Sequence, residues 1–133
     1  MAKFCKNALQ GEPIVLNGGG NQTRDFVYVS DVASIISDLI WERIDDDSVS
    51  SGGVLNVATG HQTSIASLAE KLKRFFHGKV ESIVINDGPP REGDVYSSVV
   101  DATLLNVHFP NRKMRSLDET LGRVVDWFVS VKR

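Results

Sequence analysis

The sequence predicts an α/β protein with a small mixed, partly parallel sheet and flanking helices. Short apolar runs typical of strands alternate along the chain with longer segments whose apolar residues recur at helical spacing. Repeated strand–helix alternation favours parallel pairing. The length of 133 residues, 41% of them hydrophobic and 24% charged, predicts one globular domain over residues 1–133.

The first third of the chain should form two strands and two helices. A helix is expected over residues 2–9, ending near Gly11. The run 14–16 predicts a strand that leads into a glycine turn. Residues 26–29 read as a second strand, and Ser30 or Asp31 can cap the next helix. The apolar residues of that helix follow the 3.6-residue period; they are Val32, Ile35, Ile36, Leu39 and Ile40.

The middle of the chain begins with a polar stretch over 45–53, which is typical of a surface loop. Its three aspartates lack the spacing of a calcium loop, so no metal is expected there. Residues 54–57 predict a buried strand. Ser64 should cap a helix over 65–76 that ends at Gly78.

The last third should contain a strand at 83–85, a proline loop and an alternating strand over 95–100. Asp101 is expected to cap a short helix. Ser116 and Glu119 form a capping-box pattern ahead of a closing helix.

Charge and composition argue against several classes of partner. The formal net charge of −2 provides no basic field for nucleic acid. No apolar stretch reaches the ~20 residues of a membrane span. The single Cys5 and the absence of a signal-like apolar run favour a cytoplasmic setting. Cys5 lies among apolar residues at helical spacing, which indicates a buried structural thiol.

Two arginines are candidates for binding an anion. Gly18–Gly20 leads into a strand with no following lysine, so a turn is favoured over a phosphate loop. Arg24 follows this turn and could grip a diphosphate bidentately, or equally pair with Asp25, Asp31 or another carboxylate. Arg91 is presented by a proline–glycine turn.

The second arginine, Arg91, shares its turn with Asp94. Arg91 could face a phosphate, while Asp94 could face a ribose hydroxyl or orient Arg91; the alternative is a solvated loop with a local ion pair.

The histidines show no metal-ligand spacing. Neither Tyr28 nor Tyr96 has a lysine four residues later, so no catalytic residue is predicted.

Four ordered blocks resemble the extended short-chain dehydrogenase/reductases, that is, the NAD-dependent epimerases and dehydratases of nucleotide sugars. The blocks cover nearly the whole chain: residues 4–13; 18–33, with Gly-Gly-Gly-Asn-Gln-Thr-Arg-Asp-Phe-Val-Tyr-Val-Ser-Asp-Val-Ala; 56–69; and 90–128, with Pro-Arg-Glu-Gly-Asp. The resemblance implies the C-terminal, substrate-binding part of such an enzyme, and hence a Met1 that is not its natural beginning.

The resemblance also implies roles for individual residues. Arg24 and Arg91 would contact the diphosphate of a UDP- or dTDP-sugar, and Asp94 the ribose. Val15, Leu16 and Asn17 would line the nucleobase side; many members carry an aromatic residue where this chain has Asn17, so a polar contact is expected. NAD is implied for the full-length family, but this chain lacks its glycine-rich NAD motif and its Tyr-x-x-x-Lys pair.

The predicted function is therefore nucleotide-sugar binding without catalytic competence in this chain alone. A second hypothesis is a non-catalytic interaction module that docks on a separate Rossmann half or on its own copy. A third, an independent enzyme using His61 or His108, has no supporting pattern of residues.

Overall fold

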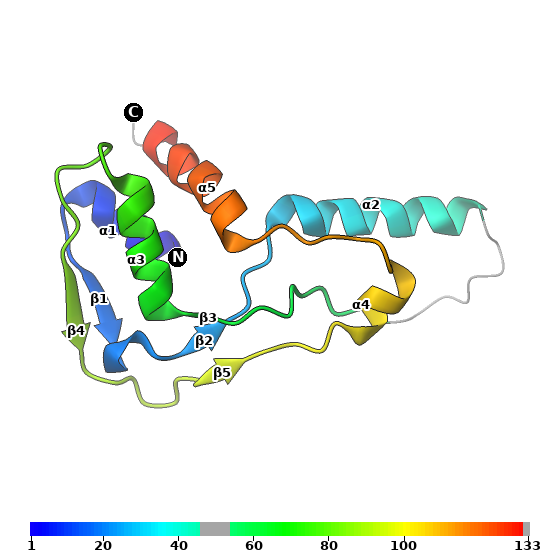
Figure 1. Ribbon diagram of the computed structural model, residues 1–133, viewed down its shortest axis with the longest axis horizontal. Helices are drawn as coiled ribbons and strands as arrows, with labels where there is room; N and C mark the ends of the chain where they lie inside the picture. Colours follow the sequence, from blue (N-terminus) through cyan, green and yellow to red (C-terminus); the bar gives the residue numbers. More distant parts are fainter. Residues whose placement is uncertain (46–53, 132–133) are drawn as a thin grey trace.

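The computed structural model describes residues 1–45 and 54–131 as a chain of short strands and five α-helices (Figure 1). In chain order the elements are α1 (Ala2–Gln10), β1 (Ile14–Asn17), the 3-10 turn η1 (Gly18–Gly20), β2 (Thr23–Arg24), α2 (Val29–Asp45), β3 (Thr63–Ser64), α3 (Ile65–Phe76), β4 (Ile85–Gly88), β5 (Ser97–Ser98), α4 (Thr103–His108) and α5 (Leu117–Val131). The predicted α/β class, with partly parallel sheets and flanking helices, is confirmed.

The strands form two small sheets. β1 and β4 pair in parallel, in a register that joins Ile14 to Ile85 and Asn17 to Gly88. In the second sheet β2 is central, antiparallel to β3 and parallel to β5. The second sheet begins just after η1, so both sheets meet at the glycine turn.

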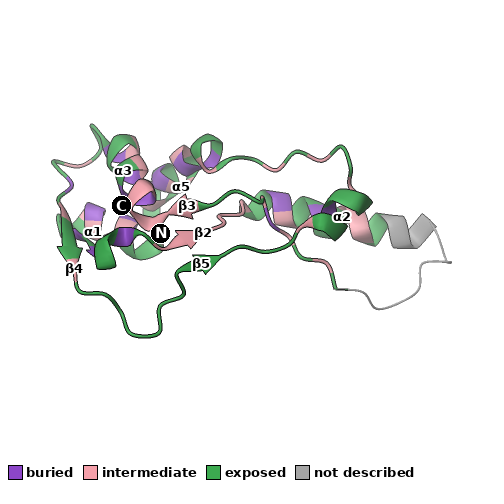
Figure 2. Ribbon diagram, turned by 60° about the horizontal axis from the view of Figure 1, so that its bottom comes forward, coloured by how far each residue is buried: buried purple, intermediate pink, exposed green. Residues whose placement is uncertain are grey.

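The hydrophobic core lies where α1, α3 and α5 pack on one another and on β1. Figure 2 shows buried residues concentrated in these helices, whereas β5 and the loops beside it are exposed. In β1, Ile14 and Leu16 are buried while Val15 is 40% exposed. This alternation turns Val15 and Asn17 toward the face of β1 opposite the core.

Two of the predicted helix caps are confirmed. Ser64 caps α3, its Oγ accepting a bond from the Ser67 backbone N–H at 3.0 Å. Ahead of α5, the Ser116 backbone N–H donates to Glu119 Oε2 at 2.6 Å, and the Glu119 N–H donates to Ser116 Oγ at 3.3 Å. The capping box therefore exists as predicted.

Two other predicted caps differ from the structure. Asp101 lies one residue before the N-cap of α4, where it accepts bonds from the backbone N–H and hydroxyl of Thr103. These bonds lower the pKa of Asp101. Ser30 and Asp31 do not cap α2, because that helix already begins at Val29.

The strand predictions were less accurate. Residues 26–28 and 54–57 form no strand, and Val54 is 87% exposed. β4 begins two residues later than predicted, and only Ser97 and Ser98 pair within 95–100. Apolar runs alone do not reveal which segment has an edge to pair with. Most of the predicted loop at 45–53 lies outside the described residues.

Helix α2 extends away from the three-helix core, with α4 beside its far part (Figure 1). Asp31, which is only 6% exposed, anchors the first turn of α2. The Asp31 carboxylate accepts from the Arg115 backbone N–H at 2.9 Å and from the Arg115 guanidinium at 2.7 Å. A second ion pair joins Asp38 to Arg112. Among the described residues, no helix combines the length and apolar character needed to cross a membrane.

Candidate functional site

A cavity of about 410 Å³ lies between α1, the outer face of β1 and the loop after β4. The alternation of β1 presents Val15 and Asn17 to it, and the loop contributes Arg91. Three of the six predicted site residues are thus brought together. The lining residues are Met1, Lys3, Phe4, Asn7, Val15, Asn17, Gln22, Ile65 and Arg91.

Arg91 is held at the cavity wall by Asn17. With the amide oxygen of Asn17 turned toward the guanidinium, it accepts from Arg91 Nε at 2.9 Å and from the terminal NH2 group at 3.2 Å. Two bonds to one oxygen limit the rotation of the guanidinium plane. Arg91 itself remains exposed, so its other donor edges are accessible to a ligand.

Arg24 is held by Asp94, with its terminal nitrogen Nη2 3.0 Å from Asp94 Oδ1. Its other terminal nitrogen, Nη1, donates to the backbone carbonyls of Thr23 and Val95, each at 2.7 Å. The two charged side chains are 30% and 28% exposed. A carboxylate therefore pairs with Arg24, as one of the two sequence-based interpretations expects, and its identity is Asp94 rather than Asp25 or Asp31.

Gln22 joins the two arginine positions, although the sequence analysis gave this residue of the 18–33 block no role. Its side-chain nitrogen donates to the Asn17 backbone carbonyl at 2.9 Å and to Asp94 Oδ2 at 2.8 Å. The only sequence signal was its place between the glycine turn and Arg24.

The remaining predicted site residue, Leu16, has its side chain in the core and is 7% exposed. It does not line the cavity, because it lies on the opposite face of β1 from Val15. Any contact from this position to a ligand would have to come from the backbone.

The described residues give no support for metal binding or for a reactive thiol in this chain. The described part of the chain contains no cluster of three or more His, Cys, Asp or Glu side chains suited to a metal. Cys5 is fully buried, and burial raises the pKa of its thiol, in agreement with a structural role. Tyr28 lies beneath the Arg115 guanidinium, 5.5 Å from its carbon, and Tyr96 is 70% exposed.

The glycine turn does not fit a dinucleotide-binding loop. Gly18, Gly19 and Gly20 all have positive φ, as a tight turn requires, but they connect β1 to β2 rather than opening an α-helix. A pyrophosphate loop needs the N-terminus of a helix behind its glycines. The turn therefore lacks the strand–turn–helix arrangement of a dinucleotide-binding fingerprint.

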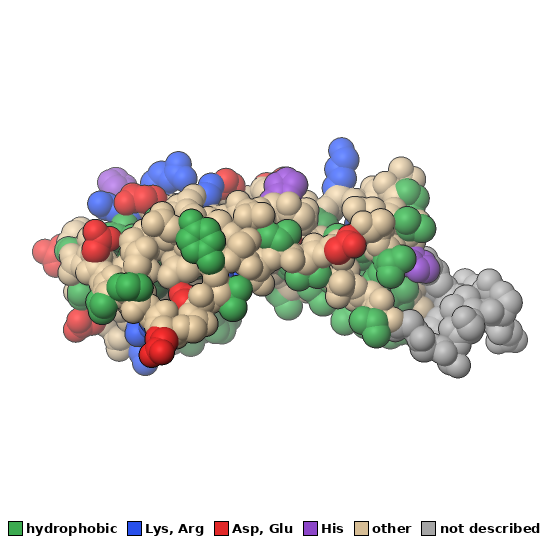
Figure 3. Space-filling model, turned by 90° about the horizontal axis from the view of Figure 1, so that it is seen from below, with side chains coloured by type: hydrophobic (Ala, Val, Ile, Leu, Met, Phe, Trp, Pro, Cys, Tyr) green, Lys and Arg blue, Asp and Glu red, His purple; other side chains and the backbone are tan. Residues whose placement is uncertain are grey.

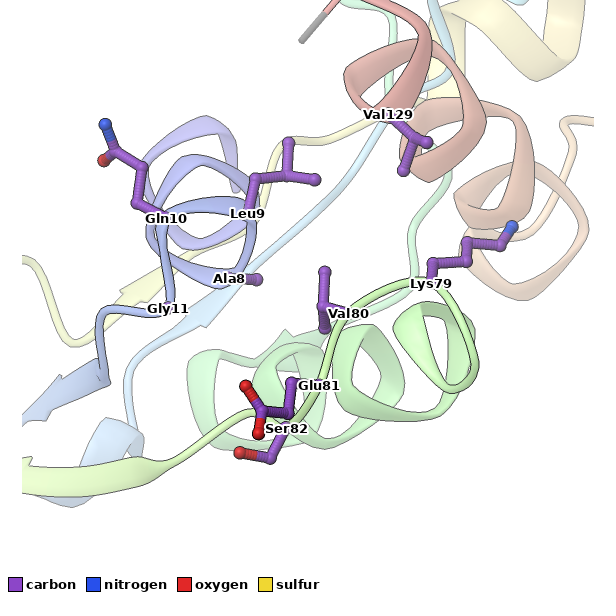
Figure 4. Close-up of a pocket in the computed structure, with 9 residues that line it drawn as sticks. All are labelled: Ala8, Leu9, Gln10, Gly11, Lys79, Val80, Glu81, Ser82 and Val129. Atoms are coloured by element: carbon purple, nitrogen blue, oxygen red, sulfur yellow. The ribbon is translucent and has the colours of Figure 1, made fainter. Parts of the chain in front are cut away.

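A different cavity, of about 550 Å³, lies at the C-terminal end of α1 (Figure 4). Leu9, Val80 and Val129 point into it from α1, the loop after α3 and α5. Its cation, Lys79, forms an ion pair with Asp126. None of the predicted site residues lines it, so we keep the cavity at Asn17 and Arg91 as the candidate site.

A family model and several known proteins are similar to this chain. Residues 1–58 match the model of the NAD dependent epimerase/dehydratase family. A putative UDP-glucose 4-epimerase of Methanocaldococcus jannaschii is 31% identical over 131 residues, which cover 98% of this chain and 39% of that protein.

Solved structures agree with this match. The UDP-glucose 4-epimerase of Thermotoga maritima, solved with UDP-glucose, has a TM-score of 0.74 and 30% identity, covering 99% of this chain and 40% of the other. The UDP-glucose 4-epimerase of Thermus thermophilus, in complex with NAD, has a TM-score of 0.73 and 26% identity, covering 96% and 39%. The chain thus spans about two fifths of the length of these relatives.

Proposed function

We propose that this chain is a member of the NAD-dependent epimerase/dehydratase family and forms the part, C-terminal in the family, that binds the nucleotide sugar. In this proposal Arg24 and Arg91 bind the diphosphate of a UDP- or dTDP-sugar. The base would lie along Val15 and Asn17. The observation that carries the proposal is a cavity lined by Arg91, which Asn17 orients, and by Gln22, whose amide binds the carboxylate of Asp94 that holds Arg24.

The electrostatics of the site support an anionic ligand. Asp94 is bound by Arg24 and Gln22, and its carboxylate neutralises part of the positive charge of Arg24. Arg91 and Lys3, which line the cavity, provide two further cations for an anionic ligand. Guanidinium groups bind phosphate oxygens bidentately when their planes are fixed. Asp94 contributes by orienting Arg24, and a contact from Asp94 to the ribose would use its remaining lone pairs.

We further propose that the chain does not carry out the redox step alone. It has no Tyr-x-x-x-Lys pair, and its glycine turn does not fit NAD. Catalytic groups and NAD would be supplied by residues outside this chain. A cytoplasmic setting stays part of the proposal, on the ground of the single buried Cys5.

Titration of the 133-residue chain with UDP and dTDP by calorimetry tests the binding assignment. Arg24→Ala and Arg91→Ala should each weaken binding by about tenfold or more, because each removes a charge-assisted contact. Arg123→Ala, at an exposed position of α5, is the matched control and should leave the affinity unchanged. Equal affinity in all three variants would reject the assignment.

A second candidate function is a docking or self-associating module. Apolar side chains are exposed on α2 and α4: Ile36 is 52% exposed, Ile40 54%, Trp41 61%, Leu104 59% and Val107 69%. Figure 3 shows hydrophobic side chains at the surface near the end of the molecule that carries these helices. Such a patch supports an interface with a Rossmann half or with a second copy.

Sedimentation velocity over a wide concentration range separates the two functions. Self-association that is reduced by Trp41→Glu would support the module. A chain that stays monomeric at every concentration and binds UDP would leave nucleotide-sugar binding as its function.

A further inference from the structure

We infer that Gln22 is a positioning residue that couples Arg24 to Arg91, so that the two arginines respond to a diphosphate as one unit. The inference rests on the proposed function, because it concerns how the same site grips its ligand. It adds a residue to which the family resemblance gave no role and whose side-chain hydrogen bonds go to Asn17 and Asp94 rather than to an arginine.

The coupling follows an unbroken chain of hydrogen bonds. With the amide oxygen of Asn17 facing the guanidinium, this oxygen accepts two bonds from Arg91, at 2.9 and 3.2 Å. The backbone carbonyl of the same Asn17 accepts from Gln22 Nε2 at 2.9 Å. Gln22 Nε2 also donates to Asp94 Oδ2 at 2.8 Å, and Asp94 Oδ1 accepts from Arg24 at 3.0 Å.

The amide of Gln22 is suited to this place because its single nitrogen carries two protons. One proton meets the Asn17 carbonyl and the other meets the Asp94 carboxylate. The side-chain oxygen of Gln22 is buried and has no partner within the part of the chain that the structure describes. In the opposite orientation that oxygen would face two acceptors, so the two bonds dictate the direction of the amide.

The bridge also joins segments that are distant in the sequence. Asn17 ends β1, Gln22 follows the glycine turn, and Asp94 lies in the loop that also presents Arg91. Displacing the loop at Asp94 therefore disturbs Arg24 through its carboxylate and disturbs Asn17 through Gln22.

A diphosphate has two linked phosphate groups, and each can occupy one guanidinium. If the arginines are positioned together, binding of one phosphate already orders the group that receives the other. Losing either arginine should then reduce the benefit of the remaining one. Without the Gln22 bridge, the two arginines should contribute independently.

A double-mutant cycle tests this inference. The affinity for UDP is measured for the chain, for Arg24→Ala, for Arg91→Ala and for the double variant. The same four proteins are then made with Gln22→Met, which keeps the side-chain length but cannot donate a hydrogen bond. Gln10→Met, at the exposed end of α1, is the matched control background.

We expect the loss caused by Arg24→Ala to differ by about threefold or more between the Arg91 and Arg91→Ala backgrounds, a size typical of residues in one hydrogen-bond network. In the Gln22→Met background this difference should vanish, while with Gln10→Met it should persist. The individual effect of each arginine should remain in both backgrounds.

Coupling that survives Gln22→Met would overturn the inference and leave the proposed function intact. Additive arginine effects in the unmodified chain would do the same. If neither arginine affects UDP affinity, the proposed function fails and the inference falls with it. Gln22→Asn, which keeps the amide but is too short to reach both acceptors, provides a second variant that should also abolish coupling if Gln22→Met does not fold.

Discussion

Three charged residues of one short segment each hold a different distant part of the chain. Arg24 engages Asp94, and Asp31 engages Arg115. Between them, the Asp25 carboxylate accepts from the backbone N–H groups of Thr59 and Gly60 at 2.9 and 2.8 Å, and from the Thr59 hydroxyl. The segment is therefore a structural junction as well as a source of a ligand-binding arginine.

Replacing Asp25 should destabilise the fold without removing a predicted ligand contact. Asp25→Ala leaves three donors of the 59–60 turn without their acceptor, and we expect a loss of about 2 kcal/mol in the free energy of unfolding. Urea denaturation measures the change. Asp87→Ala, at an exposed position of β4, should change stability by less than about 0.5 kcal/mol and serves as the control. Equal effects of the two variants would contradict the role of Asp25.

Gly20 should be far less replaceable than Gly11, although both have positive φ. A Cβ on Gly20 would lie 2.9 Å from the Ala66 backbone nitrogen, whereas a Cβ on Gly11 meets nothing within 4 Å. We expect Gly11→Ala to cost about 1 kcal/mol from conformation alone. Gly20→Ala should cost about 2 kcal/mol more, because backbone atoms cannot move aside easily.

Thermal or urea unfolding of the two glycine variants gives this difference directly, because both positions have a positive φ and incur the same cost for an alanine there. A cost at Gly20 no greater than at Gly11 would show that η1 can shift away from α3.

The candidate site was only partly predictable at the level of single residues. Arg24, Arg91 and Asp94 were identified as charged side chains beside rigid turns. Their pairing was not, because Asp94 could serve either arginine and only the folded loop decides. The role of Gln22 could not be predicted from the sequence, because it depends on two hydrogen-bond acceptors, the Asn17 carbonyl and the Asp94 carboxylate, that only the fold brings to it.

At the scale of elements, helices were predicted much better than strands. A helix carries its own hydrogen bonds and its own end signals, as Ser64 and the capping box at Ser116 illustrate. A strand needs a partner edge that local sequence does not reveal. The apolar run at 54–57 had the composition of a strand but found no such edge.

The capping box of α5 should make stability depend on pH. Bonds from the Ser116 backbone N–H and hydroxyl lower the pKa of Glu119 below its ordinary value of 4.5. A lowered folded-state pKa means that the contribution is present above the unfolded pKa and disappears as pH falls through the folded one. Wild type should thus exceed Glu119→Gln in stability near neutral pH, and the difference should shrink below pH 4.5.

Urea denaturation of both proteins across the acid range measures this difference. Ser116→Ala is the matched variant, because it removes one of the donors that stabilise the carboxylate, and it should flatten the same pH dependence. A difference between wild type and Glu119→Gln that stays constant from neutral to acid pH would contradict the assignment.

At the scale of the whole molecule, α2 is joined to the three-helix core mainly through its first turn and the segment before α5. Arg115 supplies two of the bonds to buried Asp31, and Arg112 pairs with Asp38 further along the helix. Arg112 also lies over the Phe109 ring, 4.9 Å from its centroid. Within the described ranges, the hydrophobic core cluster contains no residue of α2.

Removing Arg115 should therefore loosen α2 more than the core. In Arg115→Ala the Asp31 carboxylate keeps only a backbone donor in a buried place, and we expect a loss of about 1–3 kcal/mol. Hydrogen exchange should accelerate in α2 while α1, α3 and α5 stay protected. Arg123→Ala is the control. A uniform acceleration across all helices would show that the molecule opens as one unit.

The parallel pairing of β1 with β4 also sets an order of events in time. β1 and its partner β4 are separated in the sequence by β2, α2, β3 and α3. Contacts between distant segments close late, because the intervening chain must first be ordered. The hydrogen bonds of Asn17 with Arg91 and of Gln22 with Asp94 should therefore form late, so the cavity that Asn17, Gln22 and Arg91 line is completed near the end of folding.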